Sequence, residues 1–369
     1  MKRLVALFVL GFIFLQSAAQ AGEWYEKIKL KGDFRQRHEF IQEENKDTDR
    51  TRWRIRARLS LEGSITDDWG VHLRLATGSN DPVSTNQTLD GGFSTKGFHL
   101  DRAYFDFHPA ALEGLQIIGG KMKQPFLVME KTELIWDGDL DPEGAAFLYK
   151  GNVSDVVTAM INSAFFYIEE RKTDDDTWMV GVQTAFRVKP DDNVHITLGA
   201  GYYDYQEIEE MEGIFEPDDF FGNSHGEVVT DGDTLEGYIC DYNLFEAFGE
   251  FGFKMDNVSM KIYGNYVINT DADSLDSGYL FGTTLKHGKG RGHFKIAVNY
   301  RSIEDDAVLG VFADSDFRGG GTNGKGFEFG LGYGLANSVD LGVTYFLNDK
   351  GIDEEIEYER LQVDLKMKL

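Results

Sequence analysis

Arginine occupies every second position over residues 52–58, as Arg52, Arg54, Arg56 and Arg58. The positions between and beyond them are apolar and include Trp53, Ile55, Ala57, Leu59 and Leu61. Because β-strand side chains alternate between faces, residues 51–62 are predicted to form a strand with one apolar face and one guanidinium face. A guanidinium stays charged and offers five N–H donors, which suits carboxylate or phosphate groups.

The same alternation predicts that neighbouring strands extend this basic face. Alternation alone does not decide the facing of the strand that carries Arg102. The full predicted wall comprises Arg35, Arg37, Arg52, Arg54, Arg56, Arg58, Arg74, Arg102, Lys121 and Lys123. Inward residues of one strand lie about 6.5–7 Å apart, so Arg52 to Arg58 would cover roughly 20 Å. The wall either attracts anions or is held together by ion pairs with carboxylates on the same face.

A second charged set lies in residues 124–144. Its acids are Glu130, Glu133, Asp137, Asp139, Asp141 and Glu143, and the first five are the candidate site acids. If this segment folds inward, its acids face the arginines across a constriction, where the resulting field orients polar solutes and charged groups set ion preference. The alternative is a solvated surface loop.

Metal and catalytic sites find little support in the sequence. Asp137, Asp139 and Asp141 alternate as in calcium loops, but the glycine at the sixth position and the glutamate at the twelfth are missing. No G-x-S-x-G motif is present. We therefore predict no catalytic residue, no metal and no cofactor.

The first residues indicate secretion. Lys2 and Arg3 precede an apolar run over residues 4–15, and Ala19-Gln20-Ala21 provides a cleavage site. This pattern predicts a signal peptide over residues 1–21, since the run is short for a membrane anchor. The formal net charge of −26 argues against nucleic acid as a partner.

Beyond residue 24 the chain alternates between strands and connectors. Short turns are predicted at 63–68, 109–114, 151–154, 190–193, 256–257, 287–292 and 335–338. Longer polar connectors are predicted at 78–97, 124–144, 170–175, 206–242, 269–276, 302–325 and 347–357. This regular alternation, with about sixteen strands, is typical of an all-β transmembrane antiparallel barrel with short periplasmic turns and long external loops.

Energetics decide which face meets lipid. An arginine facing lipid at the membrane midplane costs roughly 2–4 kcal/mol. Four on one strand would approach the whole stability of a typical domain, about 5–15 kcal/mol. The arginines are therefore predicted to face the lumen. A soluble β-sandwich would instead leave them in water, but it gives no reason for the long connectors to share one end.

Several segments resemble the putative porin family of Gram-negative bacteria. They are GDFRQRHEF, RTRWRIRARLSLEG, LRLATGSNDPVSTNQT, LDRAYFDFHP and LIWDGDLDPEGAAF, all within residues 32–147. The resemblance implies a sixteen-stranded general or substrate-selective porin, often trimeric, with its third external loop folded into the pore. The final residue, Leu369, departs from the terminal aromatic residue common in outer-membrane proteins.

We expect a single barrel over residues 22–369 that serves as a passive channel in the outer membrane. Its expected partners are outer-membrane lipid and lipopolysaccharide, small hydrophilic solutes or ions, and further copies in a homotrimer. The alternative is a barrel enzyme or surface adhesin that acts through the acidic external loops. The sequence identifies neither the solute nor the ion preference, because the basic wall and acidic loops act in opposite directions.

Overall fold

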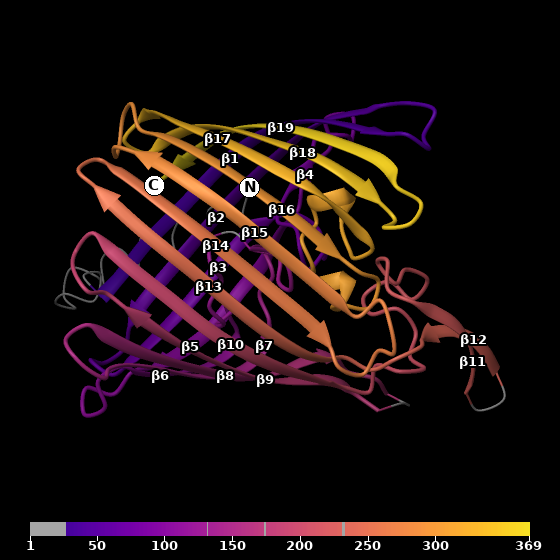
Figure 1. Cartoon of the computed structure of the whole chain (residues 1–369), viewed down its shortest axis with the longest axis horizontal. Helices are drawn as coiled ribbons and strands as arrows, with labels where there is room; N and C mark the ends of the chain where they lie inside the picture. Colours follow the sequence, from indigo (N-terminus) through magenta and orange to yellow (C-terminus); the bar gives the residue numbers. More distant parts are fainter. Residues whose placement is uncertain (1–26, 131, 173–174, 231–232) are drawn as a thin grey trace, which may run out of the picture.

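The chain forms a closed antiparallel β-barrel, whose tilted strands are seen from the side in Figure 1. The computed structural model describes residues 27–130, 132–172, 175–230 and 233–369. The predicted signal peptide at residues 1–21 lies outside this part. Within the described ranges, no helix is both long and apolar enough to cross a membrane.

Sixteen long strands make the barrel, which confirms the predicted fold class. They are β1 (Ile28–Glu43), β2 (Arg50–Ser64), β3 (Trp69–Thr77), β5 (Phe98–Phe107), β6 (Leu115–Lys121), β7 (Glu143–Asn152), β8 (Val157–Glu169), β9 (Thr177–Val188), β10 (Val194–Gln206), β13 (Asn243–Met255), β14 (Val258–Asn269), β15 (Ser277–His287), β16 (Phe294–Ile303), β17 (Gly324–Ala336), β18 (Val339–Lys350) and β19 (Ile356–Lys368). The first and last strands, β1 and β19, pair with each other and close the ring.

Two smaller elements depart from the predicted pattern. The short β4 (Gln87–Thr88) pairs with the upper part of β2, where β3 has already ended. Strands β11 (His225–Thr230) and β12 (Asp233–Tyr238) form a separate hairpin that projects from one end of the barrel in Figure 1. Both lie within connectors that the sequence predicts as irregular.

Four long connectors, residues 78–97, 122–142, 207–242 and 304–323, share one end of the barrel, while the other connectors at both ends have seven residues or fewer. The two ends of the barrel are called here the long-connector end and the short-turn end. The long-connector end holds residues 44–49, 78–97, 122–142, 170–176, 207–242, 270–276, 304–323 and 351–355. The short-turn end holds residues 65–68, 108–114, 153–156, 189–193, 256–257, 288–293 and 337–338. The predicted segment 124–144 corresponds to the β6–β7 connector, residues 122–142, so its last two residues belong to β7.

Alternation along the strands separates an apolar outer face from a polar inner one. Leu198 is 62% exposed, whereas Glu39 is fully buried although it carries a charge. Aromatic residues on the outer face lie opposite one another near the long-connector end. These pairs are Tyr202 with Phe245, Tyr266 with Tyr279, and Tyr300 with Phe327. Such a girdle is typical of a membrane-spanning barrel.

Two connectors pack against each other and against inward side chains. The β6–β7 connector buries Phe126 and Trp136. The β16–β17 connector, residues 304–323, contains η2 (Gly310–Phe312) and η3 (Phe317–Gly319) and buries Leu309. The backbone N–H of Asp137 donates to the carbonyl of Phe312 at 2.8 Å, joining the two connectors. These segments place polar groups next to the inner faces of the strands.

Candidate functional site

The predicted arginines of the first two strands share the lumenal face. In the register of β1 and β2, Arg35 lies opposite Arg56, and Arg37 lies opposite Arg54. Directly opposed residues of an antiparallel pair share one face. The neighbouring Trp53 is 49% exposed, whereas Arg37 is 4% exposed. The guanidinium face therefore lies inside the barrel and the tryptophan face outside.

Arg56 and Arg58 are both paired to carboxylates. Asp33 of β1 lies 3.0 Å from Arg56 Nη2 and 2.8 Å from Arg58 Nε. Asp139 Oδ1, from the β6–β7 connector, lies 3.5 Å from Arg56 Nη1 and 3.3 Å from Arg58 Nη1. These two guanidiniums are thus matched by one carboxylate from the adjacent strand and one from the connector.

A β-bulge next to Arg102 lets it share the inner face with Asp106 while Leu100, of the same parity, is exposed on the outer face. The register between β3 and β5 shifts beyond the Arg74–Arg102 pair, so Asp101 is an extra residue on β5. Asp101 pairs with Arg74, and Arg102 Nε donates to Asp141 Oδ1 at 2.8 Å. Asp141 also pairs with Arg74. Because the bulge interrupts alternation, the sequence could not decide the facing of Arg102.

The two predicted lysines have different surroundings. Lys121 Nζ donates to the backbone oxygen of Asp141 and to Glu143 Oε1, each at 3.0 Å. Lys123 lies in the β6–β7 connector, not on a strand, and is exposed. It takes part in no ion pair among the described residues. Lys121 therefore lies beside Asp141, the carboxylate that pairs with Arg74 and Arg102, whereas Lys123 lies apart from the arginines.

The far end of the β6–β7 connector reaches the opposite side of the barrel. Glu130 lies 2.7 Å from Lys261 Nζ on β14 and 3.2 Å from Lys295 Nζ on β16. Arg301, also on β16, donates from Nη1 to the backbone oxygen of Glu133 at 3.4 Å. Strand β14 lies half-way round the ring from β3, whose Arg74 pairs with Asp141 of the same connector. Ion pairs therefore attach the connector to two opposed walls.

Asp137 lies where the two connectors meet. Its carboxylate accepts the backbone N–H of Asp139 at 2.7 Å and that of Ser315 at 2.9 Å. Burial raises the pKa of Asp137 well above its usual value, and the negative charges of Glu133 and Asp314 raise it further. Asp137 therefore acts as a hydrogen-bonding link between connectors and is less readily ionised than an exposed aspartate.

The two other connector aspartates differ in the balance of burial and charge. Burial tends to raise the pKa of Asp139, but the charges of Arg56 and Arg58 outweigh it and lower that pKa. For Asp141, burial outweighs Arg102 and raises the pKa to about 6. Asp139 is therefore a permanent anion at neutral pH, whereas Asp141 titrates close to it.

The part of the basic wall nearest the long-connector end is called here the upper wall, and the part around Arg56 and Arg58 the lower wall. Glu39 is the central carboxylate of the upper wall, a role not predicted from the sequence. It pairs with Arg52 and lies 2.9 Å from Arg360 Nη2. Two further guanidiniums approach it at 3.4 Å (Arg37 Nη1) and 3.7 Å (Arg54 Nη1). Four arginines thus surround one fully buried carboxylate.

Two more carboxylates complete this upper cluster. Asp364 Oδ1 lies 2.7 Å from Arg37 Nε, and Asp316 pairs with Arg37 at 3.0 Å and with Arg360 at 2.7 Å. Arg360 shares the alternate positions of the last strand that carry polar residues, so its inward facing can be predicted from the sequence. The contact between Arg360 and Glu39 cannot be predicted in this way, because β19 pairs with β1 only when the barrel closes.

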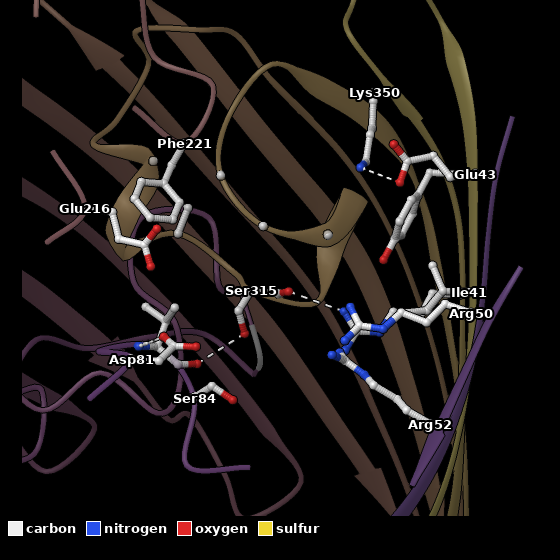
Figure 2. Close-up of a pocket in the computed structure, with 18 of the residues that line it drawn as sticks. Ile41, Glu43, Arg50, Arg52, Asp81, Ser84, Glu216, Phe221, Ser315 and Lys350 are labelled. Atoms are coloured by element: carbon white, nitrogen blue, oxygen red, sulfur yellow. Dashed lines mark hydrogen bonds and ion pairs between the residues drawn. The ribbon is translucent and has the colours of Figure 1, made fainter. Parts of the chain in front are cut away.

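A cavity of ≈ 1090 Å³ opens above this cluster at the long-connector end. Its wall includes Arg50, Arg52, Arg54 and Arg360, with serine hydroxyls at Ser84 and Ser315. Figure 2 shows Arg52 extending from its strand toward Ser315, with Glu216 and Phe221 on the far side. A second cavity of ≈ 610 Å³ lies beside the Asp139–Asp141 part of the connector.

The connector aspartates do not converge on one point. Asp139 and Asp141 are directed to different arginine pairs, while Asp137 accepts backbone N–H groups. Among the described residues, no group of three or more His, Cys, Asp or Glu side chains could hold a metal ion.

The fold and the charged lumen together define a class of protein. A closed sixteen-strand antiparallel barrel with an apolar outer face and a charged inner face is a porin-type barrel of the outer membrane. The family model described as "Putative porin" matches residues 39–234 and 244–369, and the chain belongs to this family. Family and fold favour a channel over an enzyme.

Solved structures share the fold at low sequence identity. Pseudomonas putida OprB is 10% identical with a TM-score of 0.61, covering 94% of this chain and 96% of that one. Salmonella typhi OmpF, in complex with daunomycin, is 10% identical with a TM-score of 0.57, covering 93% and 97%. Vibrio cholerae OmpT lacking loop L8 is 8% identical with a TM-score of 0.54, covering 93% and 100%. No curated protein matches the chain.

Proposed function

We propose that this protein forms a water-filled channel for passive diffusion of small hydrophilic or charged solutes across the outer membrane. The observation that carries the proposal is the apolar outer face of the strands together with the charged inner face of β1, β2, β3 and β19, clearest along β2. An inner face with more guanidiniums than carboxylates, as near Arg35 and Arg54, is less costly where water reaches it. The putative porin family supports the same function.

The β6–β7 connector is proposed to form the constriction of this channel. Its ion pairs to Arg58 on one wall and Lys261 on the opposed wall support this role. Charges fixed on both sides of a narrow passage orient polar solutes and disfavour apolar ones. The basic wall and the connector acids then set ion preference together, through the pairs they form.

Three further features belong to this proposal. Residues 1–21 are a signal peptide that is removed on export, which the charged and apolar order of those residues supports. The mature barrel contacts outer-membrane lipid and lipopolysaccharide through its apolar face and long connectors. It assembles as a homotrimer, as the family resemblance implies.

The experiment is single-channel recording of the purified, folded barrel in a planar bilayer. We expect stable conductance steps in potassium chloride, reduced by neutral polyethylene glycols small enough to enter and unaffected by larger ones. The reversal potential under a salt gradient then gives the ion preference. Absence of conductance from protein whose folding is verified by circular dichroism would overturn the proposal. It would redirect the search to the long connectors as an adhesive or catalytic surface.

A further inference from the structure

The upper cluster of arginines carries more positive than negative charge. Five guanidiniums gather there, and their ion pairs within the described residues involve three carboxylates. The arginines are Arg35, Arg37, Arg52, Arg54 and Arg360, and the carboxylates are Glu39, Asp316 and Asp364. In the lower wall the charges balance, because the two guanidiniums of Arg56 and Arg58 pair with the two carboxylates of Asp33 and Asp139. Positive charge is therefore in excess within this cluster of the wall.

Arg54 is the least satisfied member that faces the cavity. Its nearest carboxylate, Glu39, is 3.7 Å away, and that carboxylate is also shared with Arg52 and Arg360. Its hydrogen bonds go to neutral oxygens, Ser84 Oγ and the carbonyl of Asn86, both at 3.2 Å. Its buried Nε–H meets no acceptor among the described residues.

Arg35 repeats this pattern behind Arg54. It is buried, and in register it lies between two other cations, Arg56 on β2 and Lys366 on β19. Its hydrogen bond goes to the side-chain oxygen of Asn86, and it has no ion pair within the described ranges. A buried charge without a counter-charge is costly, so this part of the wall gains from an added negative group.

The large cavity gives a solute access to this surplus charge. Arg50, Arg52 and Arg54 follow one parity of β2 and all line the cavity, together with Arg360 and Ser84. The lining also includes the carboxylates of Glu43, Asp47, Asp49, Asp81 and Glu216, of which Glu43 pairs with Lys350. Alternate residues of a strand lie about 6.5–7 Å apart, so the guanidiniums form a stepped path from the mouth inward. In Figure 2, Arg50 and Arg52 occupy one wall and Ser84 the floor below Ser315.

We propose that Arg54, flanked by Arg52 and Arg360 and assisted by the Ser84 hydroxyl, binds the oxyanion of a small solute entering from the long-connector end. The solute carries a carboxylate or a phosphate, because both present paired oxygens that match the planar guanidinium fork. This inference rests on the proposed channel function and deepens it. The channel then favours small organic or inorganic oxyanions, while the ion-paired lower wall contributes little to their capture.

The experiment measures block of the chloride current through single channels by added phosphate or succinate, with glucose as the uncharged comparison. In the unmodified protein we expect saturable block by an oxyanion and none by glucose. Arg54→Gln should raise the half-blocking concentration about tenfold or more, as loss of a charge-assisted hydrogen bond implies. The matched control, Arg58→Gln, removes a paired guanidinium of the same strand and should change it less than threefold. Phosphate and succinate added separately tell which oxyanion is preferred.

Each other outcome has a definite meaning. Normal conductance without saturable block, or equal effects of Arg54→Gln and Arg58→Gln, would overturn the oxyanion site and leave the channel intact. Absence of conductance would overturn the channel instead, and calorimetric titration of the detergent-solubilised barrel with phosphate and succinate would then decide the site. If Arg54→Gln misfolds, Arg54→Lys keeps the charge and removes the fork, so weakened block in that variant supports the site and unchanged block opposes it.

Discussion

Glu39 and Arg360 form a contact between the two ends of the chain. The carboxylate on β1 lies 2.9 Å from Nη2 of the guanidinium on β19, across a sequence separation of 321 residues. Glu39 is fully buried and Arg360 is 2% exposed. The ion pair therefore bridges the seam at which the barrel closes, alongside the backbone hydrogen bonds of β1 and β19.

Replacing Glu39 by glutamine should destabilise the barrel strongly. The change removes the carboxylate shared by four arginines, and breaking a buried ion pair typically costs about 3–5 kcal/mol. Urea unfolding of the detergent-solubilised protein, followed by tryptophan fluorescence, measures the effect. Glu62→Gln is the control, because its ion pair with Lys31 is exposed and such pairs contribute roughly 0–1 kcal/mol. Equal losses in both variants would contradict the central role of Glu39.

Asp139→Asn should shift ion preference toward anions. The variant leaves Arg56 and Arg58 with only Asp33 as a common carboxylate, so the lower wall gains positive charge. Reversal potentials under a potassium chloride gradient should show a severalfold rise in the chloride-to-potassium permeability ratio. Asp90→Asn, which changes an exposed connector residue paired to Lys96, should leave the ratio nearly unchanged. An unaltered ratio in Asp139→Asn would show that solutes do not pass this pair.

The ion preference should also depend on pH through Asp141. Because its pKa is raised to about 6, the group gains a proton between pH 7 and pH 5, and Arg74 and Arg102 lose a negative partner. Anion preference should therefore rise as the pH falls. A raised pKa in the folded state also means that this group adds stability below the unfolded value of 3.8 and that the contribution is lost as pH rises through 6.

Two variants test that assignment. Reversal potentials at pH 5 and pH 7 should differ in the unmodified protein and less so in Asp141→Asn. Asp305 needs a parallel variant, since burial and the neighbouring Asp306 raise its pKa to about 6 as well. A pH effect that persists in Asp141→Asn but disappears in Asp305→Asn would transfer the effect to the β16–β17 connector.

Releasing Glu130 should make the channel current noisier. Glu130→Gln removes the charge that holds the β6–β7 connector to Lys261 and Lys295. A partly exposed ion pair is worth about 1 kcal/mol or less, so brief closures should become at most about fivefold more frequent. Single-channel recording measures this directly. Glu143→Gln, which affects an exposed pair with Lys121 at the base of the connector, should leave the closing frequency unchanged.

The strands and their faces were predictable because local alternation determines them. Arg52 to Arg58 and Trp53 take the faces that their parity predicts. The facing of Arg102 was not predictable, since the bulge at Asp101 shifts the register there. The partners of the charged groups could not be predicted either. Glu130 pairs with Lys295, 165 residues away in sequence, because the β6–β7 connector crosses the inside of the closed barrel.

The seam between β1 and β19 has a consequence for biogenesis. Its charged groups come from both extremities of the polypeptide, with Arg37 and Glu39 near the beginning and Arg360 and Asp364 near the end. A chain truncated before residue 356 would leave Arg37 and Glu39 without these partners and β1 with an open edge. The barrel therefore closes only when the polypeptide includes its last strand. Truncated chains keep an unpaired edge on β1 and stay sensitive to proteolysis.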